Sequence, residues 1–146
     1  LQKWAGRLGG GTNHRMSLND GILIKDNHLA LLRPTRQAVR VACRLAAKRS
    51  QGIPIIVEAE SLSQVQQALA AKADIILLDN MSLSQVRQAM RLIKGRALVE
   101  VSGGITLQNI RPMAAAGVNR ISIGALTHSA PAVPFSLILK RLGRRS

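Results

Sequence analysis

The chain alternates short apolar segments with longer amphipathic segments five times, and this alternation restricts its fold more than any other feature. The apolar segments are rich in Ile, Val and Leu and are largely unbroken, which is typical of strands buried on both faces. Strands that alternate with helices form a parallel sheet with right-handed crossovers. The strands are expected at Gly21–Lys25, Pro54–Glu60, Asp74–Asn80, Ala97–Gly104 and Arg120–Ala125.

Helices are expected after each of these strands. Ser61, Ser82 and Thr106 precede three of the helical segments and are expected to act as N-caps. Glycines at or just past helix ends support the same boundaries, at Gly52, Gly95 and Gly117. The expected helices are Thr35–Ser50, Leu62–Lys72, Leu83–Lys94, Leu107–Ala116 and Pro131–Leu142.

About five βα units are too few for a closed eight-stranded barrel. The predicted fold is therefore α/β, a parallel β/α-barrel-like domain that is incomplete. Residues 1–146 are expected to form one domain, because no linker or low-complexity tract interrupts them. Leu1–Gly11 resembles the last turns of a helix stopped by glycines, so we expect the start of the barrel to lie upstream of this chain.

Composition limits the classes of partner and the compartment. No apolar run approaches the roughly 20 residues of a membrane span, and no membrane partner is expected. Cys43 is the only cysteine, which excludes a disulfide framework and favours a reducing cytoplasm. The net charge of +14 could indicate nucleic acid or anionic small molecules, but stacking aromatics are almost absent, which argues against a single-strand nucleic-acid binder. Much of the charge lies along one expected helix face and in the C-terminal tail: Arg33, Arg36, Arg40, Arg44, Lys48, Lys140, Arg141, Arg144 and Arg145.

The acidic residues concentrate where a parallel sheet binds ligands. Only seven occur in the chain, and none lies within an expected helix. Glu58, Asp79 and Glu100 stand near the carboxyl ends of three successive strands, the edge at which parallel α/β proteins bind ligands. The alternative is that these acids cap helices or pair with basic neighbours. Two of them could share a hydrated Mg²⁺, which commonly takes one or two carboxylates together with substrate phosphates.

Cationic and glycine-rich segments complete the predicted site. His14, Arg15 and Lys25 offer groups that bind carboxylates and phosphates, and Lys25 ends its strand at the same edge. For His28, a hydrogen bond within its own loop is an equal alternative to ligand contact. Glycine turns follow the last two strands, at Ser102–Gly104 and at Gly124, and such turns can hold phosphate through backbone N–H groups.

At these residues the chain resembles the quinolinate phosphoribosyltransferase family. The resemblance covers essentially all 146 residues and rests on six segments: GGGTNHRMSL, LIKDNH, VEAESL, IILLDN, EVSGGI and GVNRISIGALTHS. It implies transfer of ribose 5-phosphate from phosphoribosyl pyrophosphate to quinolinate with decarboxylation, which gives nicotinate mononucleotide, pyrophosphate and CO₂. It also implies a role in NAD biosynthesis, a Mg²⁺ cofactor and a homodimer.

The resemblance assigns roles to individual residues. His14, Arg15 and Lys25 would hold the quinolinate carboxylates and the polyphosphate. Glu58 and Asp79 would face the ribose and its Mg²⁺, so that the catalytic set would be Lys25, Glu58 and Asp79. The 5-phosphate would lie among Ser102, Gly103, Gly104, Gly124 and His128.

Departures from the family pattern leave two other functions open. Ile56 stands where the family usually has Glu, and Asn119 and Pro134 stand where it usually has Asp. The family's N-terminal domain, which carries a basic Thr-Arg-Lys motif and covers the partner's site, would also lie outside this chain. The first alternative is a non-catalytic remnant that binds phosphate ligands or a partner. The second is a basic nucleic-acid-binding module, which rests on charge alone.

Overall fold

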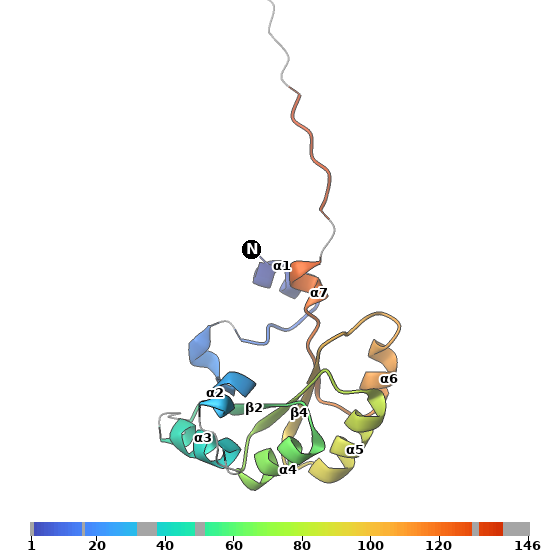
Figure 1. The fold of residues 1–146 in the computed structure, drawn as a ribbon. Coiled ribbons are helices and arrows are strands. Elements are labelled where there is room, and N and C mark those ends of the chain that lie inside the picture. The colour runs from blue at the N-terminus through green and yellow to red at the C-terminus, as the bar shows by residue number, and fades with distance from the viewer. Residues whose placement is uncertain (1, 16, 32–37, 49–51, 130–131, 139–146) are drawn as a thin grey trace, which may run out of the picture.

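The computed structural model of the chain describes residues 2–15, 17–31, 38–48, 52–129 and 132–138. Within them, five strands form one sheet in the order of the chain, and every neighbouring pair is parallel (Figure 1). The predicted α/β class with about five βα units is confirmed. The strands are β1 (Ile22–Ile24), β2 (Ile55–Ala59), β3 (Ile75–Asp79), β4 (Leu98–Ser102) and β5 (Arg120–Ile121).

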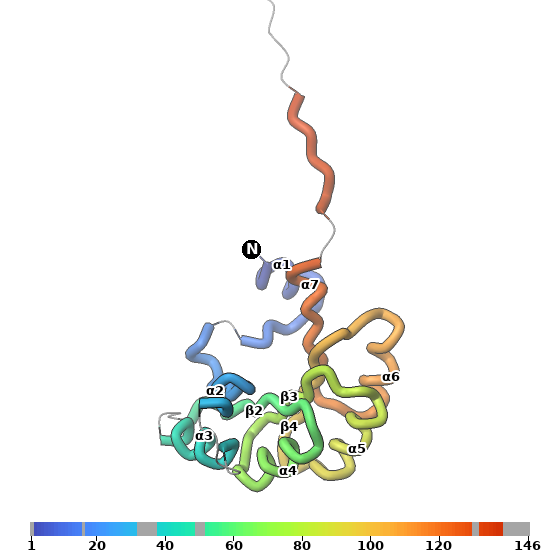
Figure 2. Tube along the Cα trace, viewed as in Figure 1, coloured from blue at the N-terminus to red at the C-terminus, as the bar shows by residue number. Residues whose placement is uncertain are grey.

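Short and long helices connect the strands, and the longer ones lie along the outer side of the sheet (Figures 1 and 2). Before β1 come α1 (Gln2–Leu8) and a single 3₁₀ turn, η1 (Leu18–Asp20). The expected helical start followed by glycines is confirmed, since Gly9, Gly10 and Gly11 donate back to the last turns of α1. The remaining helices are α2 (Asp26–Ala30), α3 (Ala38–Ala47), α4 (Leu62–Ala70), α5 (Leu83–Ile93), α6 (Ile110–Ala115) and α7 (Ala125–His128).

The two faces of the sheet have different surroundings. On β2, Val57 and Ala59 are fully buried in the large apolar core that the sheet forms with the helices. The alternate position Ile56 faces the other side, where it joins Ile75 and Leu77 in a separate small cluster. Because successive strand residues point to opposite faces, the next residue on that side of β2 is Glu58. We call the side of the sheet that carries Ile56 and Glu58 the inner face. This face is apolar toward the amino ends of the strands and ionisable near their carboxyl ends.

Helix boundaries follow local capping chemistry. Ser61 and Ser82 accept hydrogen bonds from Gln64 N and Gln85 N, so both predicted N-caps are confirmed. Thr106 was expected to cap the next helix, but this prediction is wrong because Asn109 occupies that position. The Asn109 side chain accepts from Thr106 N and donates to Gly104 O, which stabilises a turn and delays the helix.

The expected helix Pro131–Leu142 is wrong over residues 132–138, which form no regular structure and lead away from the strand–helix body in Figure 1. The rest of that range, together with the basic tail residues, lies outside the described residues. Val133 and Phe135 are 70% and 92% exposed, so this part of the chain lacks the apolar contacts that stabilise an amphipathic helix.

The basic face predicted on the expected helix Thr35–Ser50 is a solvent-exposed face where the structure describes it. Arg40, Arg44 and Lys48 are exposed, whereas Val39 and Cys43 on the opposite side of α3 are buried. Arg33 and Arg36 lie outside the described residues. None of the described helices combines the length and the apolar character that a membrane span requires.

Candidate active site

A pocket of about 250 Å³ lies on the inner face, at the carboxyl ends of the strands. Strand register accounts for its composition, because Glu58 pairs with Leu77 and Leu77 with Glu100. One row further along, Asp79 pairs with Ser102. Parallel pairing therefore brings residues far apart in sequence to one edge of the sheet. The lining residues are His14, Leu23, Lys25, Glu58, Leu77, Asp79, Glu100, Ser102 and Ser122.

Lys25 and Glu58 form an ion pair at the mouth of the pocket. Lys25 follows the last residue of β1, and its Nζ lies 3.4 Å from Glu58 Oε2. The Lys25 side chain is 50% exposed, so the pair adds at most about 1 kcal/mol to stability. The ammonium group is therefore accessible to an anionic ligand. His28 Nδ1 accepts a hydrogen bond from Lys25 N at 3.0 Å, so the contact within its loop is present, while ligand contact by His28 stays a prediction.

His14 reaches the pocket from the loop that precedes β1. Its Nε2 lies 3.3 Å from Glu100 Oε1, and the Ser122 hydroxyl donates to the same oxygen. Glu100 is only 1% exposed, and no donor among the described residues reaches its second oxygen, Oε2. Burying a carboxylate oxygen without a hydrogen-bond donor costs free energy. A polar partner that donates to Oε2 would therefore be favoured on this side of the site.

Two of these residues were missed as site residues by sequence reasoning. Glu100 was recognised as a strand-end acid but received no role, and Ser122 was not considered. The signal for Ser122 was present in the alternation of β5 and the following residue. Arg120 pairs with Glu100 in the sheet, and Ser122 lies two residues further on the same face.

Three carboxylates gather beside the pocket. One oxygen each from Glu58, Glu60 and Asp79 can be chosen so that all three lie within 4.8 Å of one another. Glu58 and Asp79 are partly buried and Glu60 is exposed. Hard oxygen donors at this spacing fit Mg²⁺, with open positions left for water and ligand phosphates. Sequence reasoning chose Glu58 and Asp79 and did not consider Glu60.

The glycine turns after β4 and β5 allow close contacts with neighbouring side chains. Gly103 has a φ of +85°, and a Cβ there would lie 2.2 Å from Asn80 Oδ1. A Cβ on Gly124 would lie 2.7 Å from His128 Nε2. His128 Nδ1 is in turn 2.7 Å from Ser129 Oγ. Only glycine fits at the first of these positions without displacing its neighbour.

Not every predicted site residue lines the pocket. Gly103, Gly104 and Gly124 lie in the turns beyond β4 and β5, and His128 is the last residue of α7; none of the four is among the described residues that line the pocket. Arg15 is also outside that set. Its Nη1 donates to Gly21 O at 3.1 Å, so the guanidinium is directed to the backbone that enters β1.

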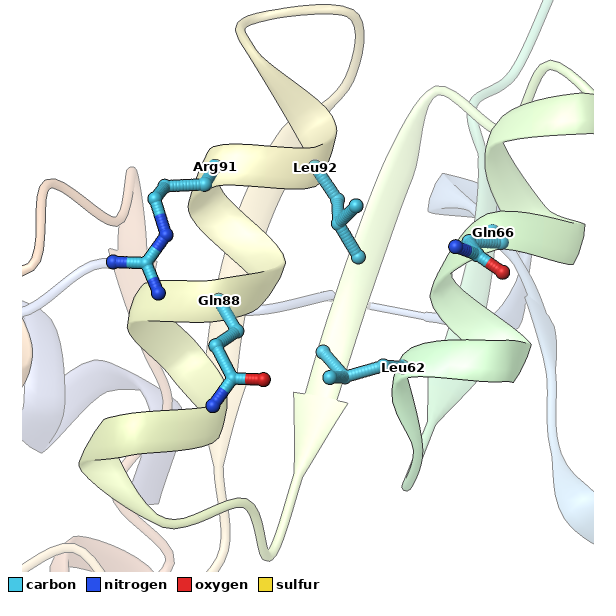
Figure 3. Close-up of a pocket in the computed structure, with 5 residues that line it drawn as sticks. All are labelled: Leu62, Gln66, Gln88, Arg91 and Leu92. Atoms are coloured by element: carbon cyan, nitrogen blue, oxygen red, sulfur yellow. The ribbon is translucent and has the colours of Figure 1, made fainter.

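A larger hollow, of about 360 Å³, lies on the outer face between α4 and α5. Figure 3 shows Leu62 and Leu92 pointing into this space, whereas Arg91 points away from it. The described residues that line it include no acidic group or histidine, and the remaining two are Gln66 and Gln88. The smaller inner pocket, with its carboxylates, ammonium and imidazole, is therefore the candidate site despite its size.

A parallel β/α sheet with ionisable residues at its carboxyl edge defines a barrel-type domain with a site for charged ligands. The chain belongs to the quinolinate phosphoribosyltransferase family, because the family model described as "Quinolinate phosphoribosyl transferase, C-terminal domain" matches residues 1–138.

Curated relatives support this assignment. The chain is 42% identical over 137 residues to a Bacillus subtilis protein named probable nicotinate-nucleotide pyrophosphorylase (carboxylating), covering 94% of this chain and 46% of the relative. Identity is 45% over 132 residues to the Mycobacterium leprae protein named nicotinate-nucleotide pyrophosphorylase (carboxylating), covering 88% and 45%. The chain thus spans about half the length of the curated relatives it matches.

Solved structures give the same picture. NadC from Streptococcus pyogenes matches with a TM-score of 0.79 and 43% identity, over 92% of this chain and 46% of that one. Thiamine phosphate pyrophosphorylase from Pyrococcus furiosus matches with a TM-score of 0.54 and 20% identity, over 71% of this chain and 48% of that one, which indicates a shared fold alone.

Proposed function

We propose that this chain supplies the catalytic pocket of a quinolinate phosphoribosyltransferase. This enzyme would catalyse a pentosyl transfer reaction in NAD biosynthesis. The observation that carries the proposal is one pocket that joins Lys25 and His14 to Glu58 and Asp79 in a domain of this family. The substrates are quinolinate and phosphoribosyl pyrophosphate. The products are nicotinate mononucleotide, pyrophosphate and CO₂.

The charged side chains divide the work between the two substrates. Glu58 and Asp79 stabilise the positive charge that develops on the ribose as its bond to pyrophosphate breaks and the bond to the ring nitrogen forms. Lys25 and His14 bind the quinolinate carboxylates and offset charge on the polyphosphate, assisted by Arg15. The backbone and hydroxyl groups of Ser102–Gly104, Gly124 and His128 are proposed to hold the 5-phosphate.

Decarboxylation follows from the charge of the product ring. Once the ribose is attached, the ring nitrogen is cationic and stabilises the electron pair left on the adjacent carbon when CO₂ departs. A proton from solvent then replaces the carboxyl group. The chain supplies orientation and electrostatic stabilisation, and no covalent enzyme intermediate is required.

We propose Mg²⁺ as the cofactor, held by Glu58 and Asp79 with Glu60 beside them. Their oxygen atoms suit this hard cation, which also binds phosphate oxygens and water. When bound, Mg²⁺ would neutralise charge on the pyrophosphate leaving group.

The test is an assay of the chain with quinolinate, phosphoribosyl pyrophosphate and Mg²⁺, in which nicotinate mononucleotide is followed by chromatography. Product that disappears in Asp79→Asn but persists in Arg91→Ala supports the proposal, since Arg91 lies at the outer hollow. If the chain gives no product but binds phosphoribosyl pyrophosphate in calorimetry, the non-catalytic phosphate-binding alternative replaces it.

We also propose that the chain works as a homodimer in the cytoplasm. Within the described sheet, β1 and β5 each pair with one neighbour only, so both edges offer unpaired backbone groups. Such edges favour association with another polypeptide. Light scattering at increasing protein concentration tests this, and a monomer at all concentrations contradicts it.

A further inference from the structure

Asn80, immediately after β3, has an unusual backbone conformation beside the candidate site. Its φ is +52°, in the left-handed region that non-glycine residues seldom adopt, although asparagine does so more readily than most. Only two other described non-glycine residues, Lys72 and Lys94, have positive φ, and both are exposed residues next to helix ends. Asn80 is therefore the residue with this conformation that adjoins the candidate site.

The side chain of Asn80 contacts Asp79, which lines the pocket, and Gly103 in the turn after β4. Its Nδ2 donates to Asp79 Oδ2 at 2.8 Å, which fixes one carboxylate oxygen and leaves Oδ1 for a ligand. Its carboxamide also occupies the space that a Cβ on Gly103 would need, since such an atom would lie 2.6 Å from Asn80 Cγ.

The backbone of Asn80 strengthens this connection. Asn80 N donates to Ser102 O at 3.0 Å, so the turn after β3 is bonded to the turn after β4. This bond continues the β3–β4 ladder past the Asp79–Ser102 pair. In its left-handed conformation, Asn80 places its carboxamide against both Asp79 and Gly103.

We propose that Asn80 is a positioning residue that sets the distance between the Asp79 carboxylate and the Ser102–Gly104 turn. This inference rests on the proposed function, in which Asp79 faces the ribose and the turn holds the 5-phosphate. Asn80 thereby matches the site to the length of a phosphoribosyl group. Quinolinate, held by His14 and Lys25, does not depend on it.

The main test compares Asn80→Gly with Lys94→Gly in the same chain. Both variants keep the left-handed backbone accessible, but only the first removes the contacts with Asp79 and Gly103. Asn80→Gly is expected to raise the KM for phosphoribosyl pyrophosphate at least about tenfold, since lost hydrogen bonds to charged groups commonly cost that much in binding. The KM for quinolinate and the Tm are expected to stay close to those of the parent, and Lys94→Gly to match the parent throughout.

Two results would overturn the proposal while the proposed function stands. The first is that Asn80→Gly has the same kinetics as the parent, and the second is that its KM rises equally for both substrates. A parent chain without turnover or substrate binding would instead refute the proposed function. In that case nuclear magnetic resonance decides the positioning role. A shift of the Asp79 carboxyl carbon in Asn80→Gly but not in Lys94→Gly supports it, and an unchanged carboxyl carbon refutes it.

Discussion

His14 Nε2 lies 3.3 Å from Glu100 Oε1, which joins a loop residue to a carboxylate buried in the inner face of the sheet. The imidazole is 30% exposed and the carboxylate 1%, so the contact spans the boundary between pocket and core. Ser122 donates to the same oxygen. One carboxylate thus positions groups from two segments that lie more than a hundred residues apart.

Two substitutions of Glu100 test how much the hydrogen bonds accepted by its carboxylate contribute to stability. Glu100→Ala is expected to lower the free energy of unfolding by about 1–3 kcal/mol, because His14 and Ser122 lose their acceptor. Glu100→Gln retains an acceptor oxygen and should cost less than about 1 kcal/mol. Urea denaturation of both variants measures the difference. Equal stabilities of the two variants would contradict this role for Oε1.

Lys25 is expected to contribute more to kcat/KM than to the free energy of unfolding. Because the Lys25 side chain in this ion pair is half exposed, Lys25→Ala should change the free energy of unfolding by less than about 1 kcal/mol. The same change should lower kcat/KM by about 10²–10³, as expected when a charge that stabilises a reacting group is lost. Steady-state kinetics and urea denaturation together test this, with Lys72→Ala as the exposed-lysine control. A large loss of stability without loss of kcat/KM would contradict the assignment.

Much of the fold could be predicted from the sequence because the signals are local. Unbroken apolar runs located all five strands, and serine before a helical stretch located two N-caps. The third cap failed because Asn109 competes for the same turn. Over residues 132–138 the expected helix is absent, because amphipathic periodicity has no effect where the apolar face has nothing to pack against.

The candidate site was harder to predict, since strand register decides which side chains meet. Lys25, Glu58 and Asp79 could be placed at one edge from their positions at strand ends. The contacts of the Asn80 carboxamide with Asp79 and Gly103 accompany a left-handed backbone conformation, which no periodic pattern reveals. Arg15 was expected to bind a ligand, which stays a prediction; the donation of its Nη1 to Gly21 O is a tertiary contact that no sequence pattern indicated.

Glu60 offers a test of the carboxylate cluster. Its side chain is exposed, but one of its oxygens can lie within 4.8 Å of oxygens from Glu58 and Asp79. Glu60→Gln is expected to raise the Mg²⁺ concentration for half-maximal activity several-fold, because it removes a negative charge beside the proposed Mg²⁺ site. A Mg²⁺ titration of the assay measures this, and Asp26→Asn serves as the control for loss of an exposed acid. An identical response in the two variants would show that Glu60 does not contribute.

Cys43 gives the chain a pH dependence that is independent of the site. Burial, assisted by the charge of Asp74, raises the pKa of the thiol from 9.0 to about 11. Folding therefore favours the protonated thiol, so this contribution to stability is complete below pH 9 and is lost as the pH rises through about 11. The loss should reach at most about 2–3 kcal/mol, the equivalent of two pKa units.

Urea denaturation between pH 8 and about 11 compares the parent with Cys43→Ala. The variant is expected to be less stable at pH 8, because it leaves a small cavity beside α3, but to lose less stability as the pH rises. Lysine titration affects both proteins alike and cancels in the difference. If the free energies of unfolding of the two proteins decline in parallel, the buried thiol does not ionise in this pH range. That result would contradict the raised pKa of Cys43 as a source of alkaline destabilisation.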